Sequence, residues 1–196
     1  MPRRPPKKTA PARKRPESTA GLRQALSRRR KEELVDALLE LAQADRGVLR
    51  QLTARFDVAA APDELVAATR QAIADATDFD ERDINHNFDY DYEAYGEVKR
   101  NLGRLIASGQ LRLAMQLALD LMKQGSYQVE MSDEGLMSED IEDCLSVVLQ
   151  ALTKCDLPAA EVTEWCSAMV DADRVGFICR EPLQSLRNRF QTRKAR

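Results

Sequence analysis

The stretch LRLAMQLALDLMKQG, residues 111–125, decides the fold class. Apolar residues recur in it at steps of three and four, which is the period of an amphipathic helix. The residues that share this face are Leu111, Met115, Ala118, Leu121 and Met122. Gly125 is expected to end the helix, because glycine readily adopts the conformation that follows a last helical turn.

The same period recurs along most of the chain and predicts an all-α protein. Helices are expected over residues 22–56, 62–76, 92–108, 111–124, 138–152, 158–170 and 182–190. Gly47 is expected to break the first of these, Ser138 to cap one, and Pro158 and Pro182 to open the last two. Only residues 83–93 alternate with a period of two, so a short strand there is the alternative reading of that stretch.

Two expected helical hairpins, residues 91–124 and 138–172, begin about 47 residues apart. This spacing is typical of HEAT or armadillo repeats, in which pairs of helices stack on one another. The sequence therefore predicts an irregular stack of antiparallel helical hairpins. Four residues are expected to meet in its core, namely Leu149, Leu152, Trp165 and Met169.

Charge is divided sharply along the chain. Residues 1–31 hold twelve Lys or Arg against Glu17 alone, a net charge of +11, so the remaining residues carry −13. Five prolines lie in the first sixteen residues, and almost nothing apolar accompanies them. Residues 1–21 are therefore expected to be a disordered basic arm, and residues 22–196 a helical domain. A boundary inside that domain would fall in the acidic stretch 77–91.

The stretch DINHNFDYDYE, residues 83–93, places oxygen-bearing side chains at every second position. An EF-hand loop starting at Asp83 needs Gly at its sixth position and Glu at its twelfth, where this chain has Phe88 and Ala94. A calcium site is therefore not expected. The stretch is interpreted as an extended connector whose acids face water while Phe88, Tyr90 and Tyr92 pack onto the helices, and as a docking surface for a protein partner. The residues assigned to that surface are Asp83, Phe88, Asp89, Tyr90, Asp91, Tyr92, Asp133 and Glu134.

A second acidic stretch, VEMSDEGLMSEDIED, covers residues 129–143. A long amphipathic helix, the loop Ser132, Asp133, Glu134, Gly135, Leu136 and a following helix with a Cys together resemble helical-repeat regions of uncharacterised bacterial proteins, some of which accompany SWIM-type zinc fingers. The resemblance covers about residues 85–155. The closely paired cysteines and histidine of the SWIM motif are absent from this sequence, so the zinc or nucleic-acid role of that motif does not carry over.

Enzymatic and metal-binding functions find little support in the sequence. His86 is the single histidine, and no nucleophile elbow, phosphate-binding loop or dinucleotide fingerprint is present. The four cysteines are eleven or more residues apart, which does not suit zinc, so no metal or cofactor is expected. No stretch suits a membrane span or a secretory signal, and we expect a cytoplasmic protein with reduced thiols.

Basic clusters bind phosphates through counterion release, which gives affinity without sequence specificity. The contact residues assigned to the basic region are Arg3, Arg4, Lys7, Lys8, Arg13, Lys14, Arg15, Arg28, Arg29, Arg30 and Lys31. The leading hypothesis is a non-enzymatic interaction or scaffold module that binds a protein, with the arm adding electrostatic contacts. The alternative is a nucleic-acid-binding accessory protein. The arm could also be a solubilising tail, or could dock on the acidic body of another copy.

Overall fold

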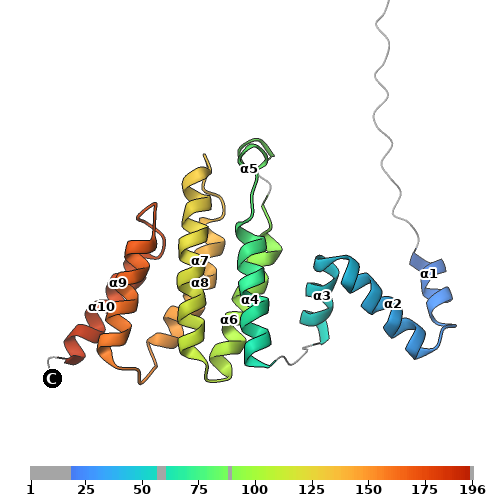
Figure 1. Ribbon diagram of the computed structural model, residues 1–196, viewed down its shortest axis with the longest axis horizontal. Coiled ribbons are helices and arrows are strands. Elements are labelled where there is room, and N and C mark those ends of the chain that lie inside the picture. Colours follow the sequence, from blue (N-terminus) through green and yellow to red (C-terminus); the bar gives the residue numbers. More distant parts are fainter. Residues whose placement is uncertain (1–18, 57–60, 88–89, 195–196) are drawn as a thin grey trace, which may run out of the picture. The chain divides into compact units, whose positions relative to one another are not determined.

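A computed structural model describes residues 19–56, 61–87 and 90–194. Within these ranges the chain is all-α, with ten helices and no strand, as the hydrophobic period predicts (Figure 1). The helices are α1 (Thr19–Leu26), α2 (Lys31–Ala44), α3 (Arg46–Phe56), α4 (Pro62–Thr77), α5 (Glu81–Asn87), α6 (Tyr92–Ala107), α7 (Leu111–Met131), α8 (Ser138–Leu152), α9 (Ala159–Ala172) and α10 (Arg180–Lys194). None of them is long and apolar enough to cross a membrane. The expected arm, residues 1–21, lies outside the described residues except for its last three positions, which belong to α1.

The chain divides into two compact units, Met1–Phe56 and Asp57–Arg196. One helical domain was expected over 22–196, with any boundary in the acidic stretch 77–91. That stretch instead lies inside the second unit, where Ile84 is buried in the main core.

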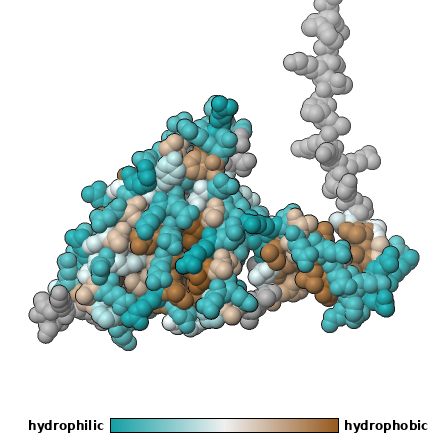
Figure 2. All heavy atoms as spheres, viewed as in Figure 1, coloured by the Kyte–Doolittle hydropathy of each residue, from teal (hydrophilic) through white to brown (hydrophobic). Residues whose placement is uncertain are grey.

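The first unit consists of α1, α2 and α3, of which α2 packs on α3. The break between these two helices falls at Asp45 rather than at Gly47. The Asp45 carboxylate accepts hydrogen bonds from the backbone N–H groups of Gly47 (2.7 Å) and Val48 (3.3 Å), so it caps α3. Hydrophobic residues lie on the surface of these helices, as Figure 2 shows.

The second unit is a two-layered stack of helix pairs. α4 pairs with α6, α7 with α8 and α9 with α10, and the three pairs follow one another in Figure 1. α4, α7 and α9 form one layer, and α6, α8 and α10 form the other. Apart from the bond between Cys179 and Glu142, hydrogen bonds along each layer join residues 44 to 52 positions apart, close to the spacing of about 47 seen in the sequence. The predicted hairpins 91–124 and 138–172 are wrong in their pairing, because α6 packs mainly on α4, α7 on α8 and α9 on α10.

The buried side chains of the second unit form one continuous core that contains Leu149, Leu152, Trp165 and Met169, as predicted. The Trp165 indole donates a 2.8 Å hydrogen bond to the backbone carbonyl of Met115. This bond ties α9 to α7 and satisfies the polar atom of a buried aromatic ring.

The prediction that Gly125 ends α7 is wrong, because α7 continues for six more residues to Met131. Gly125 serves the packing of α8 instead. A Cβ at this position would lie 2.8 Å from Cδ1 and 3.1 Å from Cγ1 of Ile141. A larger residue at position 125 would therefore force the buried Ile141 side chain to shift.

The prediction of an extended connector over 83–93 is also wrong. Residues 81–87 form the short helix α5, whose start is held by a 2.8 Å bond from the Arg82 N–H to the Asp80 carboxylate. The alternating acids do not mark a strand, because Ile84 turns inward from a helix and Asp91 caps the next one. Its carboxylate accepts a 2.9 Å bond from the Ala94 N–H at the start of α6.

Candidate interaction surface

A buried polar network joins α4, α6 and α7 beneath the partner surface that was predicted from the sequence. The Tyr95 phenol on α6 donates to the amide oxygen of Gln128 on α7, and the amide nitrogen of Gln128 donates to the carbonyl of Ala76 on α4. Tyr95 and Gln128 are almost fully buried, and burial raises the pKa of Tyr95 well above its usual value. The phenol therefore stays protonated, as its role as a donor requires.

Tyr90 attaches the connector after α5 to the start of α8. Its phenol donates a 2.7 Å hydrogen bond to Asp140, and its ring meets the Tyr95 ring edge-on, with centroids 6.2 Å apart. Burial, followed by the hydrogen bond and the charge of Asp140, raises the pKa of Tyr90 to about 12. Tyr90 thus packs onto the helices as predicted, and its partner belongs to the second acidic stretch.

Asn85 brings the two acidic stretches together. Its side-chain nitrogen donates to the Met131 carbonyl (3.2 Å), and its side-chain oxygen accepts from the Asp133 N–H (2.8 Å). α5 and the turn after α7 therefore lie side by side, although they are 46 to 48 residues apart in sequence. We call the exposed acids of these two segments, Asp80, Glu81, Asp133 and Glu134, the acidic edge.

The remaining residues of the predicted partner surface are placed differently from one another. Tyr92 was expected to pack beneath the connector, but its side chain is 65% exposed. Asp91 is half-buried in its capping role. Phe88 and Asp89, together with the side chain of Asp83, lie outside the part of the chain that the structure describes.

An aromatic and cationic ladder crosses the layer of α4, α7 and α9, and none of its residues was predicted from the sequence to form a site. Phe79, Tyr127 and Arg174 lie one repeat apart from each other. The rings of Phe79 and Tyr127 are 6.0 Å apart, and the Arg174 guanidinium lies 4.8 Å above the Tyr127 ring. Arg174 is also paired with Glu130. The Tyr127 ring and the Glu130 carboxylate partly cover the charge of Arg174. The ladder is therefore a link between repeats rather than an open binding site.

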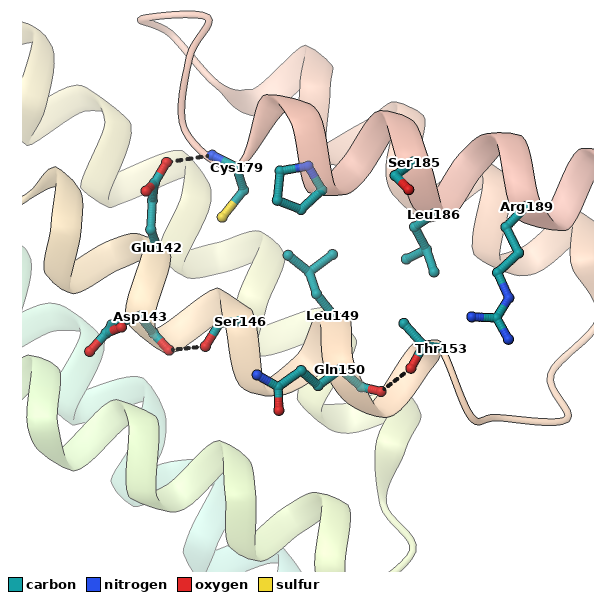
Figure 3. Close-up of a pocket in the computed structure, with 11 residues that line it drawn as sticks. Glu142, Asp143, Ser146, Leu149, Gln150, Thr153, Cys179, Ser185, Leu186 and Arg189 are labelled. Atoms are coloured by element: carbon teal, nitrogen blue, oxygen red, sulfur yellow. Dashed lines mark hydrogen bonds between the residues drawn. The ribbon is translucent and has the colours of Figure 1, made fainter.

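A groove of about 530 Å³ separates α8 from α10 (Figure 3). Leu149, Pro182 and Leu186 give it an apolar wall. Glu142 and Asp143 lie at one end, and Arg189 lies at the other. The groove therefore combines an apolar middle with opposite charges at its two ends, and none of its residues was assigned to a site from the sequence.

Cys179 lines the acidic end of the groove but does not have the character of a nucleophile. Its backbone has φ of 52°, an unusual conformation for a residue other than glycine, and its N–H donates a 2.9 Å bond to the Glu142 carboxylate. Burial, followed by the charges of Glu142 and Asp173, raises the pKa of the Cys179 thiol to about 12. A thiol that stays protonated at neutral pH is a packing group.

The part of the basic region that the structure describes lies at the junction of α1 and α2. Arg28, Arg29, Arg30 and Lys31 are all exposed there, and Arg30 contacts Glu33 at 3.3 Å. The other assigned basic residues, Arg3, Arg4, Lys7, Lys8, Arg13, Lys14 and Arg15, lie outside the described residues.

Among the described residues no group of His, Cys, Asp and Glu side chains is arranged to hold a metal ion. Comparison with models of known protein families, with curated proteins and with solved structures found no match.

Proposed function

We propose that this chain is a non-enzymatic helical interaction module whose second unit binds a protein segment rich in Lys and Arg. The observation that carries the proposal is the junction at Asn85, which joins two acidic stretches from different repeats into one exposed edge. The second unit has 26 acidic and 15 basic residues, a net charge of −11. A field of this sign attracts basic segments and repels nucleic acid.

The groove offers an apolar surface for side chains of the bound segment, which the acidic edge does not. α8 begins directly after the turn that carries Asp133 and Glu134, and Glu142 lies just over one helical turn into α8. A bound segment could therefore place basic residues on the acidic edge and at Glu142, and an apolar residue between Leu149 and Leu186. Charge would guide the encounter, and the apolar contact would hold the complex.

The test is binding of a fluorescent twelve-residue peptide of Lys and Arg with Leu at every fourth position, measured by anisotropy. We expect binding that weakens as salt rises from 50 to 300 mM, because the charges involved are exposed. The triple variant Glu81→Gln, Asp133→Asn, Glu134→Gln, which neutralises three residues of the acidic edge, should weaken it about tenfold or more.

A control variant makes the same change in net charge elsewhere in the unit, at the exposed acids Asp63→Asn, Asp156→Asn and Glu164→Gln. It should leave the affinity within about twofold. Equal losses in the two triple variants would mean that only net charge matters, and would overturn the assignment of the acidic edge.

A second function is favoured by the exposed cluster Arg28, Arg29, Arg30 and Lys31 together with the basic residues that precede it. This region would bind DNA or RNA weakly and without sequence preference. Each neutralised phosphate of B-DNA contributes about −0.9 to the slope of log affinity against log salt. Removal of residues 1–18, which carry seven basic residues and Glu17, should reduce the magnitude of that slope by several units. An unchanged slope would exclude these residues as the nucleic-acid contact.

A further inference from the structure

The first unit leaves most of its apolar side chains uncovered. Ala42 is the single buried residue among the side chains of 19–56 that the structure describes. Leu39 and Leu41 on α2 are each more than half exposed, as is Phe56 on α3. Among the residues of this unit that the structure describes, the exposed large apolar ones are Leu22, Leu26, Val35, Leu38, Leu39, Leu41, Leu49 and Phe56.

This exposure lowers the stability of the folded unit in water. A helix of 14 residues is marginal in water, and chains of about 40 residues rarely bury enough surface to be stable without help. The leucines of α2 exceed what packing on α3 can cover, since Val35, Leu38, Leu39 and Leu41 stay exposed with α3 in place. A further surface of suitable chemistry would therefore stabilise α2.

The charges along α2 indicate what that surface is. At its beginning, residues 28–33 hold four basic residues together with Glu32 and Glu33, a net charge of +2, whereas at its end residues 40–46 hold Glu40, Asp45 and Arg46, a net charge of −1. A second α2 in the opposite direction would place each basic cluster beside the acidic end of the other helix, with the leucines between them. A parallel pair would place the two basic clusters against each other, which costs energy.

We propose that two copies of this chain associate through their first units, with the two α2 helices antiparallel across a two-fold axis. Such an interface is self-complementary, because each copy offers the same apolar centre and the same two charged ends. The dimer would carry two second units and hence two acidic edges, so a partner with repeated basic segments would bind it more tightly than a single copy. The association itself does not depend on that partner.

The test is the mass of the full chain in solution, measured by sedimentation equilibrium after nuclease treatment. We expect twice the chain mass of 22.1 kDa at micromolar concentration. The double variant Leu38→Asp, Leu39→Asp should be monomeric, with Trp165 fluorescence unchanged because the core of the second unit is intact. The control is Leu136→Asp in the second unit, since Leu136 is 42% exposed and Leu38 is 40% exposed.

Charge variants test the direction of pairing. Arg28→Glu with Arg29→Glu should weaken the dimer about tenfold, and adding Glu40→Arg should restore part of the affinity, because a charge swap at both ends preserves an antiparallel match. A 22.1 kDa species for the unmodified chain would overturn the proposal. So would a dimer that survives Leu38→Asp, Leu39→Asp, one that Leu136→Asp dissociates, one that nuclease abolishes, or a charge swap that fails to restore association.

Discussion

Tyr95 and Gln128 form a 2.5 Å hydrogen bond between α6 and α7 inside the core of the second unit. Gln128 uses its other end to hold the last turn of α4 through the Ala76 carbonyl. Three helices from two successive pairs therefore depend on one amide side chain. This network fixes the ends of the helices from which the acidic edge extends.

Replacing Tyr95 with Phe should lower the free energy of unfolding by about 1–3 kcal/mol, because the Gln128 oxygen would be left buried without its donor. Urea denaturation followed by Trp165 fluorescence would measure the change. Tyr92→Phe is the control, since this phenol is on an exposed side chain, and it should change stability by less than about 0.5 kcal/mol. Equal effects of the two changes would contradict the role given to the network.

Gly125→Ala should destabilise the protein by about 1–3 kcal/mol, because the new methyl group overlaps Ile141. The matched control is Gly103→Ala inside α6, where the nearest atom to a new Cβ is Cγ1 of Val147 at 3.9 Å. There the gain in helix propensity should prevail and stabilise the protein by up to about 1 kcal/mol. Thermal unfolding of the two variants should give shifts of opposite sign.

Alkaline pH should unfold the protein in part through Tyr90. Its pKa is about 12 in the folded state and about 10 in an unfolded chain, so its stabilising contribution is complete below pH 10 and is lost as pH rises through 12. The urea midpoint should therefore fall between pH 9 and pH 11, and it should fall less in Tyr90→Phe. The same fall in both proteins would show that ionisation of Tyr90 does not contribute to alkaline unfolding.

Only one of the four cysteines should react quickly with a thiol reagent at pH 8. Cys144, Cys166 and Cys179 are buried, and burial raises the pKa of each thiol above its usual value. Cys155 is partly exposed. One fast equivalent is expected with Ellman's reagent, absent in Cys155→Ser, and the other three should react only as the protein opens. Two or more fast thiols in the native protein would disprove the packing described for these residues.

The helical periods predicted most of the elements because each helix has to bury one continuous face. α4 and α6 begin at or beside the residues expected, and Leu149, Leu152, Trp165 and Met169 meet in the core. Gly125 was misjudged because its role is set by Ile141 on another helix, which no local pattern reveals. The alternation over 83–93 misled for a similar reason, since helix caps and a strand face both favour acids at short intervals.

The site was less predictable than the fold. Both acidic stretches were identified from composition, but their contact depends on the single side chain of Asn85. The groove exists because α8 and α10 stand apart at this point, and that separation depends on how whole helices pack. The ladder did leave a signal, because Phe79, Tyr127 and Arg174 are 48 and 47 positions apart, close to the repeat length already noticed.

The repeat length has a consequence for how the second unit opens. No hydrogen bond between its helices joins residues more than 52 positions apart among those described, so each pair is held only by its immediate neighbours. Within the described residues α9 and α10 are held from one side, through α7 and α8. Thermal fraying should therefore start with this pair, ahead of the centre of the stack. A segment bound in the groove between α8 and α10 would contact both helices. Occupancy of the groove would therefore slow the local unfolding of α9 and α10.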